Sequence, residues 1–454
     1  MERVSDAALG MGGARPAFTL LNRYDPLTFE LDAKRGAVKH SVNRPTDVFI
    51  GRQPIYDRSL QIFAYELLYR CSEEKNYAEI VDGDLASAEV LVNAILEIGL
   101  DNIVGPHKAF FNFTRQVLLE KREFPLAVDQ LVVEVLETVE PDAAVVDAVT
   151  ALAKRGHTIA LDDFVFREEL KPLLDAADIV KLDVLALSRA QLVQHVEMLR
   201  SFPVKLLAEK VETLSDYEYC RDLGFDYFQG YFLSRPNIMY EKTIPANRLA
   251  ALNLIAQLQE PGVELEDLER IISSDVTLSL KLLRSVNSVF YGLYKEVSSI
   301  RQAILYLGMR FIRNWATVLA MARLDDKPTA LMTTALVRAK MCSSLHSSSD
   351  SEHEGLFFIV GLFSVLDALM DMPLSDILER LPLSQEVSAA LLSHDGAAGR
   401  GLACTLAYEQ GDWASVMESE FGNQATRNAY LSAIFWADQT MVELGLERPT
   451  GPRS

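Results

Sequence analysis

Acidic residues stand at the ends of short apolar runs in the first half of this chain. These residues are Glu134, Asp162, Asp163, Asp183 and Glu209. Charged groups are costly to remove from water, so a chain that repeats a strand and a helix usually collects them at one mouth of the fold. Carboxylate oxygens are the ligands that hard divalent cations prefer. The spacing therefore predicts a site that holds divalent metal ions.

Strands that alternate with helices must position these residues. Strands are expected at 49–56, 60–70, 109–113, 132–137, 158–162, 178–183, 204–208 and 227–231, and helices at 84–98, 141–155, 167–176, 188–200 and 213–222. This alternation favours an α/β fold with a parallel sheet, either closed as a barrel or doubly wound. Neither GxGxxG nor GxxxxGK occurs, which argues against a nucleotide-binding fold with a phosphate-cradling loop.

Length and charge limit the classes of protein to consider. A chain of 454 residues is too long for one core and predicts two or three domains. Residues 1–46 are rich in Gly, Ala, Arg and Pro and are expected to form a flexible tail. A net charge of −20 argues against binding nucleic acid through its phosphates, because such binding needs a basic surface.

Hydropathy and cysteine spacing predict a cytoplasmic protein that does not enter a membrane. No apolar run approaches the ~20 residues needed to span a bilayer, and the N-terminus shows no secretion signal. Cys71, Cys220, Cys342 and Cys404 are far apart and lack CxxC spacing. They therefore argue for a reducing compartment and against both a disulfide framework and a zinc site.

Beyond Pro245 the strand signals nearly vanish and amphipathic helices follow. Asp275 is expected to cap one helix, and Ser298-Ser299 precede another that ends at Gly308. Further helices are expected at 311–323, 329–345, 355–371 and 384–393, with helical patterning over 400–445. Residues 243–454 are therefore predicted to form a separate all-α domain.

With these residues in view, the stretch 48–236 resembles the EAL family of cyclic di-GMP phosphodiesterases. Glu66 stands at the signature Glu within Glu66-Leu67-Leu68-Tyr69-Arg70. The other matching motifs are Asn112, Glu134-Val135-Leu136-Glu137, Asp162-Asp163-Phe164, Lys181-Leu182-Asp183, Glu209-Lys210-Val211-Glu212, Gln229-Gly230-Tyr231 and Ser234-Arg235-Pro236. Each motif alone is a weak signal, but all of them occur in the family's order with sensible gaps.

The resemblance implies a TIM-like α/β barrel over residues 47–242 that hydrolyses cyclic di-GMP to linear pGpG with Mg²⁺ or Mn²⁺. Two such ions would neutralise the phosphoryl oxygens and activate a water. One ion would be held by Glu66, Asn112, Glu134 and Asp162, and the second by Asp162 with Asp163. The remaining implied roles are Lys181 orienting or deprotonating the water, Glu209 as ligand or base, Gln229 positioning water or substrate, Arg70 binding a phosphate, and Glu137, Asp183 and Glu212 supporting the ligands.

The second half resembles an HDOD domain, a relative of the HD phosphohydrolases that has lost their metal ligands. Residues 283–288 and 297–304 carry the similarity. Where an HD hydrolase has a His-Asp pair, this chain has Ser364-Val365. His346, His353 and His394-Asp395 have no spacing that would complete a metal site. The resemblance therefore implies a module that binds a protein partner or a second copy of the chain.

Two observations leave alternatives open. A single acid at a strand end usually caps the following helix, and a single Asn in an apolar strand is usually a core polar group. After Asp163-Phe164 the family expects Gly, whereas this chain has the bulkier loop 165–170 beginning with Val165, so a turn with positive φ would be costly there. The competing hypothesis is therefore a receptor or scaffold that binds cyclic di-GMP without hydrolysing it and signals through the HDOD domain.

Overall fold

Eight strands close a barrel in the first half of the protein. The computed structural model describes residues 48–71, 95, 98–120, 127–234, 245–288, 297–324, 327–346 and 351–446, so the expected tail at 1–46 and most of the helix expected at 84–98 lie outside the described residues. The strands are β1 (Val48–Asp57), β2 (Ile62–Cys71), β3 (Lys108–Phe113), β4 (Leu131–Val135), β5 (Thr158–Leu161), β6 (Ile179–Asp183), β7 (Lys205–Glu209) and β8 (Tyr227–Gln229). They follow one another around the barrel in chain order, which confirms the predicted barrel.

The first strand runs against the others. β1 is antiparallel to both β2 and β8, whereas each pair from β2 to β8 is parallel. A tight hairpin causes this reversal: the Asp57 carboxylate accepts hydrogen bonds from the Ser59 and Gln61 N–H groups, at 2.7 and 3.0 Å. β1 is thus the strand that seals the barrel between its first and last parallel strands.

Short helices follow the strands and cover the barrel. They are α2 (Leu100–Val104), α3 (Arg115–Leu119), α4 (Ala143–Lys154), α5 (Lys171–Leu174), α6 (Arg189–Leu199) and α7 (Leu214–Leu223), with 3-10 turns η2 (Glu168–Leu170) and η3 (Phe232–Ser234). Local capping explains their starts, because Asp142 and Ser188 accept N–H bonds from the first turns of α4 and α6. The helix expected at 167–176 is shorter than predicted, because its first turn is the 3-10 turn η2.

The second half is all-α, as predicted. Its helices are α8 (Ala246–Gln259), α9 (Leu265–Ser273), α10 (Val276–Val286), α11 (Ile300–Leu307), α12 (Met309–Met321), α13 (Thr329–Leu345), α14 (Ser351–Phe363), α15 (Leu366–Met370), α16 (Leu374–Leu378), α17 (Gln385–Ser393), α18 (Gly396–Glu409), α19 (Trp413–Glu418) and α20 (Asn423–Glu443). Asp275 and Ser299 cap α10 and α11, and Gly308 ends α11 with φ +87°. These caps were expected from the sequence.

One helix expected at 355–371 is broken into α14 and α15. The break falls at Ser364, whose hydroxyl donates to the Gly361 carbonyl at 2.7 Å and so competes with helical bonding. The Arg338 guanidinium also donates to the Ser364 hydroxyl and to Glu409, at 3.3 and 2.9 Å. A largely buried Arg338–Glu409 ion pair therefore lies beside the break between the two helices.

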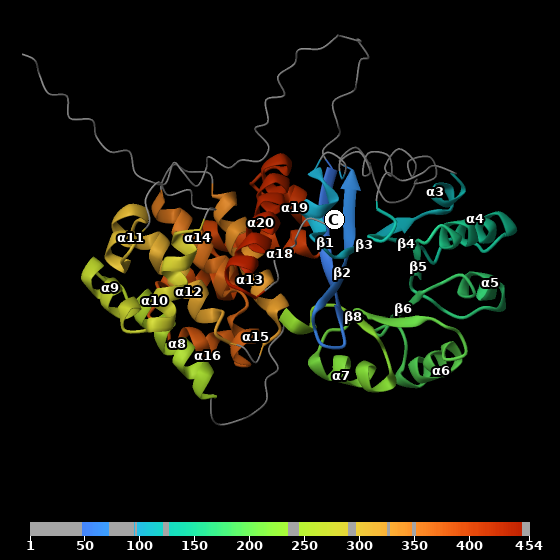
Figure 1. Ribbon diagram of the computed structural model, residues 1–454, viewed down its shortest axis with the longest axis horizontal. Helices are drawn as coiled ribbons and strands as arrows, with labels where there is room; N and C mark the ends of the chain where they lie inside the picture. Colours follow the sequence, from blue (N-terminus) through green and yellow to red (C-terminus); the bar gives the residue numbers. More distant parts are fainter. Residues whose placement is uncertain are drawn as a thin grey trace, which may run out of the picture.

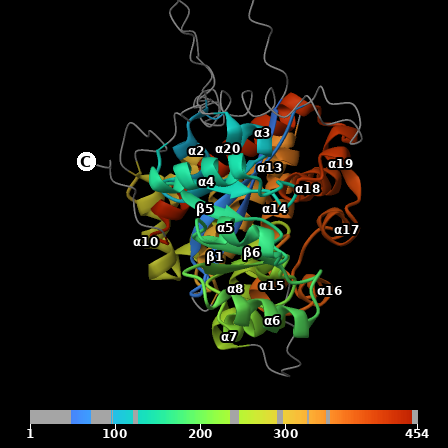
Figure 2. The same ribbon diagram turned by 90° about the vertical axis from the view of Figure 1, so that its right-hand side faces the viewer.

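The two halves meet along β1 (Figures 1 and 2), with the barrel on the right of Figure 1 and the yellow-to-red helices on the left. Phe49 stacks on Trp413 with ring centroids 5.5 Å apart, and the Tyr430 hydroxyl accepts from the Arg52 N–H at 3.1 Å. The Arg52 guanidinium is 4% exposed and makes two bonds to Asp438, at 2.8 and 3.1 Å. The strand that seals the barrel is thus also the strand that contacts the helical half.

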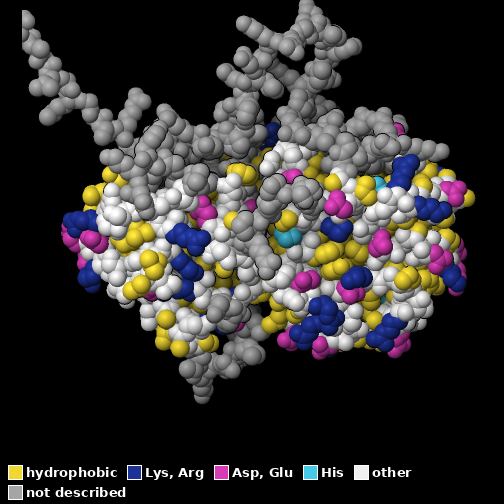
Figure 3. Space-filling model, in the orientation of Figure 1, with side chains coloured by type: hydrophobic (Ala, Val, Ile, Leu, Met, Phe, Trp, Pro, Cys, Tyr) yellow, Lys and Arg dark blue, Asp and Glu magenta, His cyan; other side chains and the backbone are white. Residues whose placement is uncertain are grey.

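Acidic and basic side chains are interspersed over the face of the molecule shown in Figure 3. Among the described residues, no helix is both long enough and apolar enough to cross a membrane.

Candidate functional site at the mouth of the barrel

The barrel interior is built in two layers, and the upper layer is polar. The lower layer takes one apolar residue from each strand: Ile55, Ala64, Phe110, Val132, Ala160, Ile179, Leu207 and Tyr227. Because side chains alternate across a strand, residues two positions further toward the mouth face the same interior. These positions are Gln53, Glu66, Asn112, Glu134, Asp162, Lys181, Glu209 and Gln229. The seven of these that were predicted as site residues therefore converge at one end of the barrel.

Lys181 lies at the centre of this polar layer. Its side chain is 1% exposed, and its ammonium contacts Glu209 at 2.7 Å, Asp162 at 2.9 Å and Glu66 at 3.5 Å. It also donates to Glu134, whose side chain is fully buried. One ammonium therefore forms ion pairs with four carboxylates, which come from β2, β4, β7 and the residue after β5.

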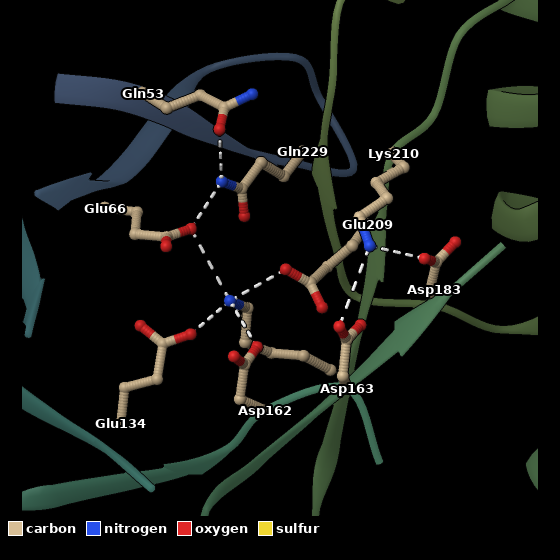
Figure 4. A network of polar contacts seen from close by, with 10 residues as sticks. Gln53, Glu66, Glu134, Asp162, Asp163, Asp183, Glu209, Lys210 and Gln229 are labelled. Carbon is tan, nitrogen blue, oxygen red and sulfur yellow. Dashed lines mark hydrogen bonds and ion pairs between the residues drawn. The ribbon is translucent and has the colours of Figure 1, made fainter. Parts of the chain in front are cut away.

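Gln229 extends this network toward β1. Its amide donates to Glu66 at 2.7 Å and to the Gln53 side-chain oxygen at 2.9 Å (Figure 4). Gln53 lies directly opposite Glu66 in the antiparallel β1–β2 pair. The polar contacts thus form a continuous chain from the sealing strand to the carboxylates.

Burial shifts the pKa values of the acids in this layer. Burial raises the pKa of Glu209 to about 8 and the pKa of Glu134 well above its usual range, against the opposing effect of the Lys181 ammonium. Burial and the neighbouring Asp162 also raise the pKa of Asp163. The pKa of Lys181 is raised too, because its four acidic neighbours outweigh the lowering effect of burial. The contacts of these acids therefore do not offset the effect of burial on their charged forms.

Oxygen atoms without donors show the same deficit. Within the described part of the chain, five buried side-chain oxygens here have no hydrogen-bond partner: Asn112 Oδ1, Glu134 Oε2, Asp163 Oδ1, Glu209 Oε2 and Gln229 Oε1. Carboxylate and amide oxygens are the ligands that Mg²⁺, Mn²⁺ and Ca²⁺ favour. The residues present therefore fit divalent cations.

Asp162 and Asp163 reach the same mouth because β5 ends before them. The Asp162 N–H still donates to the Val135 carbonyl at 3.0 Å, but Asp163 has φ +38° and turns the chain. Adjacent residues on a regular strand would point to opposite faces. The turn instead lets one oxygen each from Asp162, Asp163 and Glu209 lie within 4.8 Å of one another. The positive φ therefore falls on Asp163, and not on Val165, where the missing Gly had suggested it.

The supporting residues predicted from the sequence lie in three different settings. Asp183 accepts from the Leu185 and Ala186 N–H groups and pairs with Lys210 at 2.5 Å, so it lies beside the site. Glu137 is exposed in the turn after β4, and Glu212 is partly buried after β7. Arg70 lies in β2, opposite Phe49, but its side chain lies outside the described residues.

Two residues of the site were missed by the motif analysis. Gln53 lies on β1, whose only acid is at its far end, and only its place two residues before the buried Ile55 points to it. Lys210 lies within the Glu209-Lys210-Val211-Glu212 motif, and its ammonium lies 2.5 Å from Asp183 and 3.7 Å from Asp163. A basic residue directly after the predicted site residue Glu209 was the signal that could have revealed it.

Family models match both halves of the chain. The EAL domain matches residues 93–236, and the HDOD domain matches residues 244–376. The EAL match begins after β2, so it does not include Glu66.

Similar proteins align over most of the length. The cyclic di-GMP phosphodiesterase CdgJ of Vibrio cholerae is 32% identical over 397 residues, covering 86% of this chain and 92% of CdgJ. YuxH of Bacillus subtilis is 31% identical over 407 residues, covering 87% of this chain and 99% of YuxH. A solved EAL domain protein from Listeria monocytogenes is similar with a TM-score of 0.33 and 22% identity, covering 42% of this chain and 88% of that one. The two domain matches, together with a relative that aligns almost end to end, show that this chain belongs to the family of EAL proteins that also carry an HDOD domain.

Proposed function

We propose that this protein is a metal-dependent phosphodiesterase that opens cyclic di-GMP to the linear dinucleotide pGpG. The observation that carries the proposal is the polar layer at the barrel mouth, in which buried acids and orphaned oxygens surround one lysine. The order of the EAL motifs and the similarity to CdgJ support cyclic di-GMP as the substrate. Divalent ions bound there would neutralise the phosphoryl oxygens and lower the pKa of the attacking water.

The chain's residues divide the work by position. Glu66, Asn112, Glu134 and Asp162 would hold one ion, and Asp162, Asp163 and Glu209 would hold the second, because their oxygens cluster. Lys181 would hold the attacking water in place, and a carboxylate beside its ammonium, Glu209, would take the proton of that water. Gln229 would orient water or substrate, since its amide is already fixed by Glu66 and Gln53. Arg70 would bind a phosphate of the substrate as a bidentate donor.

Mg²⁺ or Mn²⁺ are the proposed ions, because the ligand set is carboxylate with one amide oxygen. We propose the cytoplasm as the compartment, because Cys220, Cys342 and Cys404 are buried free thiols, as in reducing compartments.

The helical half is proposed to regulate the barrel, or to bind a protein partner or a second copy of the chain. The contact of α20 with β1, next to Gln53, supports a link between the helical half and the site.

Turnover by the purified full-length protein with Mn²⁺ tests the proposal. Glu134→Gln and Asp162→Asn should each lower the rate of pGpG formation at least about 100-fold, because each removes a positioned ligand. Glu197→Gln, which changes an exposed acid on α6, is the matched control and should keep the wild-type rate. Calorimetry with cyclic di-GMP in Ca²⁺ runs beside this assay. Binding without turnover by the wild type would replace the enzyme with the receptor hypothesis.

A further inference from the structure

A second lysine side chain, that of Lys210, lies at the Asp163 end of the site. The Lys210 ammonium is 2.5 Å from Asp183 Oδ2 and 3.7 Å from Asp163 Oδ2 (Figure 4). Asp163 belongs to the cluster of three acids whose oxygens lie within 4.8 Å of one another. Lys210 thus contacts Asp163, a ligand proposed for the second ion alone, whereas Lys181 contacts ligands proposed for both ions.

Lys210 has an unusual backbone conformation for a residue with a side chain. Lys210 has φ +56°, a conformation that side-chain-bearing residues adopt reluctantly and that Gly adopts freely. The following Val211 is held in place, because its N–H donates to the Gln229 carbonyl at 2.9 Å and its backbone packs against Gly230 too closely for any side chain there. The chain therefore carries a cationic side chain at a position where the backbone conformation favours Gly.

The two lysines differ in how firmly they are held. Lys181 is buried and has four carboxylate partners, whereas Lys210 is 52% exposed and has two. An exposed lysine on a flexible stem can leave its partners for water. Lys210 can therefore be displaced from Asp163, whereas Lys181 is fixed within the barrel.

The charges around the mouth show what Lys210 would do to bound metal. Six carboxylates lie there, from Glu66, Glu134, Asp162, Asp163, Asp183 and Glu209, against two ammonium groups. When all are ionised, the formal excess is four negative charges, which equals the charge of two divalent ions. A divalent ion on Asp163 must sit close to the Lys210 ammonium or push it aside, and like charges a few ångströms apart repel.

We infer that Lys210 is a tethered counter-cation that weakens binding of the second divalent ion at Asp163 and so sets the metal concentration at which the site fills. This inference rests on the proposed function, because it takes the barrel mouth to be a site for two divalent ions. It assigns Lys210 a positioning role on Asp163 and Asp183, and no contact with the substrate.

Direct binding of Mn²⁺ tests the inference without any activity assay. The full-length protein is titrated with Mn²⁺, and free Mn²⁺ is measured by electron paramagnetic resonance. Lys210→Gln removes the charge, and Lys210→Arg is the matched control that keeps it; both retain a side chain at the positive-φ position. Lys210→Gln should tighten the second binding step about threefold to tenfold and move the first step less. Lys210→Arg should bind both ions as the wild type does.

An unchanged or weaker second step in Lys210→Gln would overturn the inference and leave the proposed function in place, provided that Glu134→Gln abolishes the first step. A single Mn²⁺ in every variant would overturn the inference together with the two-ion form of the proposed site. If the wild type binds no Mn²⁺ at all, the metal site of the proposed function fails and the inference fails with it. The unfolding temperature of each variant in EDTA shows that the compared proteins are folded.

Discussion

At the scale of single residues, the stability of the metal-free barrel depends on Lys181. Its ammonium is buried among four carboxylates, so its removal leaves acids that must repel one another or take up protons. We expect Lys181→Met to lower the free energy of unfolding in EDTA by about 3 kcal/mol, the usual cost of breaking a buried ion pair. Thermal unfolding followed by circular dichroism measures this, with Lys154→Met on the exposed end of α4 as the control.

Divalent cations should reverse part of this loss. Mn²⁺ bound at the proposed site of the folded protein would stabilise that state and would supply the charge that the missing ammonium supplied. The difference in unfolding temperature between Lys181→Met and the wild type should therefore be smaller in Mn²⁺ than in EDTA. An equal difference in both conditions would contradict the electrostatic account of this layer.

Sequence reasoning placed most of the site because it rests on strand periodicity and ordered motifs. Acids such as Asp162 and Glu209 come at the ends of predicted strands, and the structure brings them together. Gln53 could not be found in this way, because its role depends on β1 lying next to β8, a pairing of residues far apart in the chain. The turn at Asp163 was foreseen as a strand end, but its positive φ depends on the backbone bonds of both neighbouring strands.

At the scale of elements, the end of helix α17 is strained at His394. This exposed residue has φ +57° in the left-handed region, where helices commonly end in Gly. His394→Gly should raise the free energy of unfolding by about 0.5 kcal/mol or more, measured by urea unfolding. The same substitution at His195, inside α6, should lower it by a similar amount. A loss at both positions would refute the strain at His394.

The cap of α10 should make stability depend on pH. Asp275 accepts from the Leu278 N–H at 2.9 Å, and the bond from Arg323 lowers the pKa of its carboxyl. A lowered folded pKa stabilises the protein above the unfolded value of about 3.9 and ceases to do so as pH falls through the folded pKa. Asp275→Asn keeps the acceptor and loses the charge.

The variant should therefore be less stable than the wild type at pH 7, by about 1 kcal/mol or less, and the gap should close below about pH 4. Unfolding temperatures of both proteins at several pH values measure this. A gap that is constant with pH would show that the charge of Asp275 contributes nothing.

The elements were largely predictable, and the departures are tertiary in origin. Helices such as α10 and α11 have local caps that the sequence displays. The break between α14 and α15 involves the bond of Arg338 with Ser364, and the pairing of β1 with β8 joins residues far apart in the chain. Neither feature can be found in a short window of sequence.

At the scale of the whole molecule, the Arg52–Asp438 pair joins the two halves. The guanidinium also donates to the Ile103 carbonyl at 2.5 Å and lies over the Tyr65 ring, 4.3 Å from its centroid. Asp438→Ala should lower the free energy of unfolding by about 2 to 3 kcal/mol, because it leaves a buried guanidinium without its carboxylate. The double variant Arg52→Met with Asp438→Ala should lose less than the sum of the single variants. Additive losses would show that the pair is not coupled.

The position of β1 affects whether the barrel can be expressed without the helical half. A fragment that ends after β8 would still contain the strand that closes the barrel, but Phe49 would lose Trp413 and Arg52 would lose Asp438. Such a fragment would expose the Phe49 ring and an unpaired Arg52 guanidinium on β1, the strand that closes the barrel. The barrel should therefore be produced together with the helical half. A gene fusion that replaced the helical half would give a stable protein only if the residues of β1 that contact it changed as well.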